Sequence, residues 1–235
     1  MMGVNAIVFD LDGTLVEFRM DYTSLRKEAV ETIESIYGIP THVISTEISI
    51  FGMLEKVSRY LDSANGSHAI IADLRRQLSS MASKYEIDTA KTTQLIPDAE
   101  NVLREMHSNG FKMGLFTTGA KDAMNHVLQR FDLAKYFDVC VARDDAPKVK
   151  PDPSHLNLVL SLLKTPPSQA LVVGDTTLDV ECAKAAGVRS IGVLTGVHKS
   201  DQLRAAGATY ILNTLRELPQ LVRTINAEPV QAKLE

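Results

Sequence analysis

The chain has 235 residues, a size that suits one large domain or a main domain carrying a smaller inserted one. Apolar residues make up 45% of the chain, which is enough for a sizeable core. The formal net charge of −4 argues against a nucleic-acid-binding protein, because such proteins usually present a basic face.

Cysteine content and hydropathy exclude two further classes of protein. The two cysteines, Cys140 and Cys182, are too few for a disulfide framework and lack metal-site spacing. No apolar run approaches the roughly 20 residues that cross a bilayer, and the N-terminal run lacks the basic segment and cleavage site of a signal peptide. We therefore expect a cytoplasmic protein that binds neither nucleic acid nor a membrane.

Short apolar runs predict buried strands along most of the chain. The first covers residues 6–9, and five more follow at 112–116, 139–141, 170–173, 190–193 and 210–212. Segments with helical periodicity lie between the later runs, at 99–109, 123–131, 154–163, 178–186 and 215–225. This alternation predicts an α/β fold with a doubly wound, Rossmann-like parallel sheet.

Residues 17–94 interrupt the alternation. Their periodicity predicts helices over 22–37, 46–61 and 68–85, with no strand pattern between them. We expect an all-helical cap domain inserted after the first strand, joined to the core by tethers near 16–21 and 89–96. The catalytic core would then consist of residues 1–16 and 95–235.

Two pairs of aspartates follow predicted strands. In an open α/β sheet, ligands bind beyond the carboxyl ends of strands. Asp10 and Asp12 follow the first strand two residues apart, so an extended backbone turns both carboxylates to the same side. Asp175 ends the fourth strand, and Asp179 lies on its side if the intervening turn is helical. A cluster of such carboxylates suits Mg²⁺, which prefers hard oxygen ligands.

Purely structural roles for the same aspartates remain open at this stage. Asp-Gly is a common turn pair, so Asp10 and Asp12 could belong to a solvated turn. Asp179 could be an ordinary acidic residue at a helix N-terminus, where the helix dipole favours it.

The other two strand ends carry groups that suit a phosphate. Thr117 and Thr118 follow the second strand, where a hydroxyl and free backbone amides could contact a phosphoryl oxygen. Lys150 lies well past the third strand, in the segment 147–153, whose prolines restrict the backbone. Its compact charge suits a phosphate or dampens carboxylate repulsion.

The order and spacing of these four strand-end groups resemble the haloacid dehalogenase-like superfamily of phosphohydrolases. Residues 10–15 resemble its first motif, Thr117 the second, residues 150–153 the third and residues 174–179 the fourth. Residues 179–187 and the helical insert resemble the phosphoglycolate phosphatase-like branch with its helical cap.

The resemblance implies a role for each aspartate of the first and fourth motifs. Asp10 would attack phosphorus and form an aspartyl-phosphate, with Asp12 as general acid and then base. Mg²⁺ would be held by Asp10, the backbone carbonyl of Asp12, and Asp175. Asp179 would lie in or next to the coordination shell, with water as one possible link.

The resemblance also implies the phosphate ligands. Thr117 and Lys150 would bind the transferring phosphoryl group, and Lys150 would also steady Asp10. Relatives often have Asn where this chain has Thr118, so its side-chain role stays open, although its backbone amide could still bind phosphate. Arg19, on the first tether, could bind an anionic group of the substrate, or it could be a solvated arginine.

The expected partner is a small phosphorylated metabolite, and the expected cofactor is Mg²⁺. Phosphoglycolate, a sugar phosphate, a nucleotide and pyrophosphate all remain open as substrates. A phosphomutase of the β-phosphoglucomutase type and a non-catalytic phosphate-binding module are alternatives. Dehalogenation is disfavoured by Asp12, because displacing halide needs no protonated leaving oxygen.

Overall fold

The structure is a computed structural model that describes residues 3–17, 19–63 and 68–227. The chain divides into two compact units, a core unit of Met1–Phe18 and Ala90–Glu235 and a helical unit of Arg19–Thr89. Among the described helices, none is long and apolar enough to span a membrane.

The core unit contains a six-stranded sheet whose strands are all parallel. The strand order is β3-β2-β1-β4-β5-β6, and neighbouring strands pair in parallel register. The strands are β1 (Ala6–Phe9), β2 (Lys112–Phe116), β3 (Val139–Val141), β4 (Ala170–Gly174), β5 (Arg189–Val193) and β6 (Tyr210–Leu212). The predicted doubly wound sheet is confirmed, and each predicted strand matches to within one residue at its ends.

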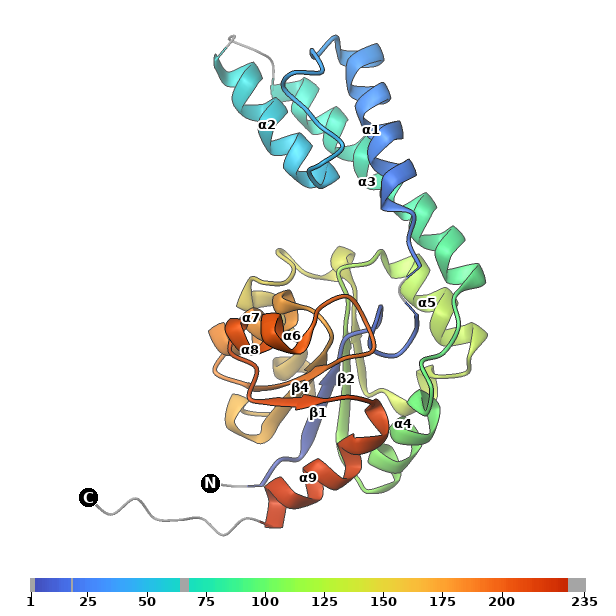
Figure 1. Cartoon of the computed structure of the whole chain (residues 1–235), viewed down its shortest axis with the longest axis vertical. Helices are drawn as coiled ribbons and strands as arrows, with labels where there is room; N and C mark the ends of the chain where they lie inside the picture. Colours follow the sequence, from blue (N-terminus) through green and yellow to red (C-terminus); the bar gives the residue numbers. More distant parts are fainter. Residues whose placement is uncertain (1–2, 18, 64–67, 228–235) are drawn as a thin grey trace, which may run out of the picture. The chain divides into compact units, whose positions relative to one another are not determined.

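Helices cover both faces of this sheet (Figure 1). On one side lie α6 (Pro153–Leu163), α7 (Thr177–Ala185) and α8 (Ser200–Ala206), and on the other lie α4 (Ala99–Ser108), α5 (Lys121–Arg130) and α9 (Leu218–Ala227). Short 3₁₀ turns join them at η1 (Ala134–Tyr136), η2 (Arg143–Asp145), η3 (Pro167–Gln169) and η4 (Leu215–Glu217). Helix α8 was not predicted, because its seven residues are too few to show a clear helical period.

Strand β1 is buried on both faces, and this determines where Asp10 points. Ala6 and Val8 pack in one cluster with α6 and α7, so the alternation of a strand directs Ile7 and Phe9 to the opposite face. The amide of Asp10 still donates to the carbonyl of Val173 at 2.9 Å, which continues the ladder with β4. The Asp10 side chain therefore points to the α6 and α7 side.

The strand order reverses at β1. The chain moves from β1 to β2 and β3 on one side, then crosses to β4 on the other side of β1 and continues to β5 and β6. The carboxyl ends of β1 and β4 thus form the topological switch point, where ligands bind in such sheets. Asp10 and Asp175 are the first residues after these two strands.

The helical unit has a core of its own. It contains α1 (Tyr22–Tyr37), α2 (Ile50–Ser63) and most of α3 (His68–Thr92), and its residues 19–63 and 68–89 include no strand. Leu25, Ala29 and Ile33 recur every four residues on α1 and pack with buried side chains of α2 and α3. Helix α2 begins four residues later than predicted, and α3 continues seven residues beyond its predicted end.

The chain segments that leave and re-enter the core unit pair with each other. Val16 forms an antiparallel bridge with Leu95, and the amide of Glu17 donates to the carbonyl of Gln94 at 2.8 Å. The hydroxyl of Thr93 donates to the Glu17 carbonyl at 2.8 Å. Both ends of the inserted segment are therefore held together at the core.

Candidate active site

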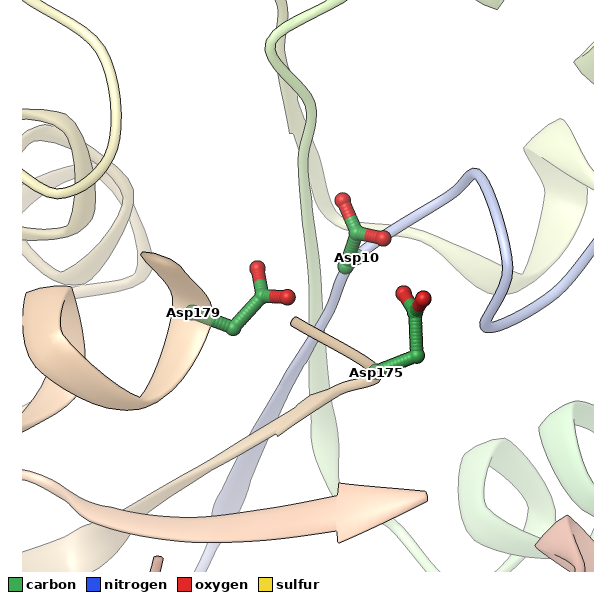
Figure 2. Close-up of side chains that lie close together, drawn as sticks. All are labelled: Asp10, Asp175 and Asp179. Atoms are coloured by element: carbon green, nitrogen blue, oxygen red, sulfur yellow. The ribbon is translucent and has the colours of Figure 1, made fainter. Parts of the chain in front are cut away.

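Three buried carboxylates meet at the switch point of the sheet. Asp10 follows β1, Asp175 follows β4 and Asp179 lies in the first turn of α7, and Figure 2 shows them projecting from these separate elements into one region. One oxygen from each lies within 4.8 Å of the others, and all three side chains are buried. The structure thus brings Asp10 of the first motif together with Asp175 and Asp179 of the fourth motif.

Lys150 is the cation of this cluster. Its Nζ donates to Asp10 Oδ1 at 2.5 Å and to Asp179 Oδ1 at 2.6 Å, and it lies 4.2 Å from the centre of the Phe116 ring. Burial alone would lower the pKa of Lys150, but the charges and hydrogen bonds of Asp10 and Asp179 outweigh it, so the pKa is raised. Lys150 therefore stays protonated, and the structure places it beside Asp10.

Burial also perturbs the carboxylates. It raises the pKa of Asp10 well above its usual range, an effect that Lys150 opposes and that Asp179 and Asp175 reinforce. Burial and the charge of Asp179 raise the pKa of Asp175 to about 6. With all three carboxylates ionised beside one ammonium group, two negative charges would remain in a buried space, and a divalent cation would balance them.

Glycines allow the backbone to approach these carboxylates closely. A Cβ at Gly13 would lie 2.4 Å from Asp175 Oδ2, and one at Gly174 would lie 2.3 Å from Asp179 Cγ. Gly13 also has a φ of +86°, in the left-handed region that favours glycine. A Cβ at Gly196, in the loop after β5, would lie only 1.9 Å from Asp175 Oδ2. A side chain at any of these positions would force the carboxylate or the backbone to move.

Asp175 is held by groups that the sequence did not reveal. The hydroxyl of Thr14 donates to its Oδ1 at 3.2 Å, and the amide of Val197 donates to its Oδ2 at 2.8 Å. The hydroxyl of Thr195 donates to the carbonyl of Gly13 at 2.8 Å, which joins the two loops. The loop after β5 carries no recognisable motif, so the only signal for its role was its position after a strand.

Asp179 bonds both to the start of helix α7 and to Lys150. Its Oδ2 accepts hydrogen bonds from the amide and the hydroxyl of Thr176, at 3.0 and 2.6 Å, which forms a capping box at the start of α7. Its Oδ1 accepts from Lys150. Both oxygens therefore have protein partners, and the carboxylate fixes the lysine as well as the helix start.

The loop after β2 lies against Asp12. The hydroxyl of Thr117 accepts a hydrogen bond from the amide of Gly119 at 3.0 Å and donates to Asp12 Oδ2 at 3.5 Å. Thr118 is partly buried, and its carbonyl accepts from Arg143 Nη1 at 3.0 Å. The use of the Thr118 amide for phosphate stays a prediction.

Arg19 belongs to the helical unit, whereas the elements of the site belong to the core unit. It is exposed at the first residue of the helical unit. Its role as a ligand for the substrate stays a prediction.

Known proteins with similar sequences show the family of this chain. The family model described as haloacid dehalogenase-like hydrolase matches residues 7–193. A protein of Caldanaerobacter subterraneus subsp. tengcongensis assigned as a pyrophosphatase, PpaX, is 29% identical over 94% of this chain and 96% of its own length. The phosphoglycolate phosphatase of Salmonella typhi is 27% identical over 93% of this chain and 92% of its own length.

Solved structures share the fold. The crystal structure of a Thermotoga maritima protein assigned as a β-phosphoglucomutase superposes with a TM-score of 0.62 at 23% identity, covering 94% of this chain and 100% of that one. The family match spans most of the chain and includes Asp10, Lys150 and Asp175. The chain therefore belongs to the haloacid dehalogenase-like hydrolases and is a phosphohydrolase.

Proposed function

We propose that this protein is a Mg²⁺-dependent phosphatase that hydrolyses a small phosphomonoester through an aspartyl-phosphate on Asp10. The observation that carries the proposal is the buried Asp10 carboxylate at the switch point, 2.5 Å from Lys150 and grouped with Asp175. The phosphoglycolate phosphatases among the relatives support a small anionic substrate.

The donor set suits magnesium. The candidate ligands are carboxylate oxygens, the type that Mg²⁺ prefers, and the buried site carries excess negative charge. Asp10 and Asp175 would hold the ion, together with the backbone carbonyl of Asp12, whereas Asp179 already shares its oxygens with Lys150 and Thr176. Bound Mg²⁺ would neutralise charge on the phosphate and on these carboxylates.

The residues of the chain divide the chemistry between them. A carboxylate oxygen of Asp10 forms a bond to phosphorus while the bond from phosphorus to the leaving oxygen breaks, and Asp12 gives that oxygen a proton. Water then attacks the phosphorus of the aspartyl-phosphate and gives a proton back to Asp12. The bond between Asp10 and phosphorus breaks, and inorganic phosphate leaves.

Thr117 and Lys150 are assigned to the transferring phosphoryl group. Phosphoryl transfer depends mainly on positioning and on neutralising charge at the equatorial oxygens. Lys150 also balances the charge of the free Asp10 carboxylate before attack and after hydrolysis, since it bonds directly to that carboxylate. The selection of the leaving group is assigned to the helical unit, with Arg19 as a candidate ligand.

The test is the variant Asp10→Asn. An amide is nearly the same size but cannot form the acyl-phosphate, so kcat should fall on the order of 10³-fold or more. The assay is phosphate release from p-nitrophenyl phosphate with Mg²⁺, followed by a panel of phosphoglycolate, sugar phosphates, nucleotides and pyrophosphate. Asp132→Asn, at an exposed aspartate paired with Lys135, is the matched control. Activity retained in Asp10→Asn would refute the proposed nucleophile.

A phosphomutase is the second candidate. It rests on the structural similarity to the Thermotoga maritima protein assigned as a β-phosphoglucomutase, and it would use the same aspartyl-phosphate. The two candidates differ in their products. Isomerisation of a sugar phosphate without release of inorganic phosphate would favour the mutase, and release of phosphate favours the phosphatase.

A further inference from the structure

The turn η2 (Arg143–Asp145), which follows β3, is bonded to the loop that follows β2. The amide of Arg143 donates to the Gly119 carbonyl at 3.0 Å, and its Nη1 donates to the Thr118 carbonyl at 3.0 Å. Asp144 and Asp145 accept from the amide and the ammonium group of Lys121, each at 2.6 Å. All three residues of the turn therefore bond to residues 118–121, which directly follow Thr117.

The hydrogen bond from Arg143 Nη1 to the Thr118 carbonyl is linked through further hydrogen bonds to Asp12. The peptide group between Thr118 and Gly119 accepts from Arg143 at its carbonyl and donates through its amide to Thr117 Oγ1 at 3.0 Å. The Thr117 hydroxyl in turn donates to Asp12 Oδ2 at 3.5 Å. A continuous chain of donors thus runs from the Arg143 guanidinium to the carboxylate of Asp12.

This chain determines the direction of the Thr117 hydroxyl. A hydroxyl has one proton and two lone pairs and rotates to suit its partners. Because Oγ1 accepts the Gly119 amide, its own proton is directed to the side of Asp12. A cation at the start of such a chain polarises the peptide group and strengthens the following bonds.

We infer that Arg143 is a positioning residue that holds the Thr117–Gly119 loop, and with it the Thr117 hydroxyl, in the orientation that phosphoryl transfer requires. This inference rests on the proposed function, since it assigns the loop to the phosphoryl group. Arg143 acts through Thr118 and Gly119 and needs no contact with the substrate.

The main-chain and side-chain hydrogen bonds of Arg143 can be tested separately. Substitution of Arg143 removes the bond from Nη1 to the Thr118 carbonyl but keeps the bond from its amide to Gly119. The bonds of Asp144 and Asp145 to Lys121 also remain. The turn should therefore stay in place in the variant, while the peptide group before Gly119 loses its fixed direction.

The experiment compares Arg143→Ala with Arg143→Lys and with the control Lys148→Ala. Lys148 is exposed in the same segment and pairs with Asp152 at 3.3 Å, so its variant removes the same charge without touching the loop. Phosphate release from p-nitrophenyl phosphate is measured with saturating Mg²⁺, together with Mg²⁺ affinity and thermal stability.

Arg143→Ala should lower kcat by about tenfold or more while KM changes little, because loop orientation matters most in the transition state. Millimolar guanidinium chloride should restore part of the lost kcat, and sodium chloride at the same ionic strength should not. Arg143→Lys should retain more activity than Arg143→Ala. Mg²⁺ affinity should stay unchanged in all variants, because its ligands lie on other loops.

Wild-type kcat in Arg143→Ala would overturn the inference, as would a loss that matches Lys148→Ala. A loss of kcat in both Arg143 variants that follows a fall in thermal stability, with no rescue by guanidinium, would make the arginine structural only. Failure of the proposed function gives a different result, because the wild-type protein would then release no phosphate or Asp10→Asn would remain active.

Discussion

Replacing Gly196 with alanine tests whether the loop after β5 fixes Asp175. A Cβ added at Gly196 would lie 1.9 Å from Asp175 Oδ2 and 2.3 Å from its Cγ, whereas real contacts essentially never fall below 3.0 Å. The backbone of Gly196 lies outside the left-handed region, so alanine adds no strain of its own. The effect of the substitution therefore falls on the carboxylate or on its loop.

The size of the effect follows from the partners of Asp175. Either the carboxylate or the loop must move by about 1 Å to restore a contact of 3.0 Å, and the side chain is fully buried. Such a movement breaks the bond from the Val197 amide at 2.8 Å or the bond from Thr14 at 3.2 Å. Losing a hydrogen bond to a buried charged group costs about 1.5–3 kcal/mol. We expect Mg²⁺ affinity to fall by about 10- to 100-fold, the usual loss when a group that orients a metal ligand is removed.

The assay is calorimetric titration of Mg²⁺ together with phosphate release at limiting Mg²⁺. Gly110→Ala is the control, because Gly110 has a φ of +79° and no atom lies within 4 Å of the place that a Cβ would take. That variant should lose about 1–2 kcal/mol of stability through backbone strain and keep its Mg²⁺ affinity. Wild-type Mg²⁺ affinity in Gly196→Ala would refute the reasoning, because it would show that the loop yields without moving Asp175.

Three further predictions concern buried charges. Lys150→Met leaves Asp10 and Asp179 without their cation, so the free energy of unfolding in urea at neutral pH should fall by about 3–5 kcal/mol; a loss under about 1 kcal/mol would contradict this. Burial raises the pKa of Asp175 to about 6, so protons compete with the metal below that pH. Mg²⁺ affinity measured by calorimetry should then fall about tenfold for each pH unit below that value. A flat profile would count against Asp175 as a ligand. Burial and Lys150 lower the pKa of His155 to about 4 from 6.5. The unfolded chain therefore binds a proton first as pH falls, and stability is lost across this window by roughly 3 kcal/mol, since one pKa unit corresponds to about 1.4 kcal/mol. His155→Gln should flatten that slope in urea titrations, and parallel slopes would exclude the histidine.

Much of the fold could be predicted from the sequence because parallel strands in this class are buried on both faces. Ala6–Phe9 and Ala170–Gly174 are therefore continuous apolar runs that end at a polar residue, and their ends were predicted to within one position. The bounds of the inserted helices were less accurate. Helix α3 continues to Thr92, because nothing in the sequence after residue 85 stops a helix until its tertiary contacts do.

The candidate site was predicted to the extent that it consists of side chains at strand ends. Asp10 and Asp175 directly follow strands and Lys150 lies in the segment between β3 and α6, and the carboxyl ends of parallel strands meet at one edge of the sheet. The contacts that the sequence did not predict are made by main-chain groups or depend on a glycine that has no side chain. The Val197 amide and Gly196 have no sequence signature of their own, because any residue has an amide and glycines serve many purposes.

The sequence by itself determined the chemical groups of this protein and the order in which they follow the strands. It specified the carboxylates of Asp10 and Asp175, the ammonium group of Lys150 and the parallel sheet that carries them. Only the tertiary structure decided which of these groups touch and what charge they hold. Lys150 meets Asp10 across 140 residues of chain and Thr14 meets Asp175 across 161 residues, and the shifted pKa values arise from that packing. Burial and distance are properties of the packed sheet and its loops, so no local pattern of residues encodes them.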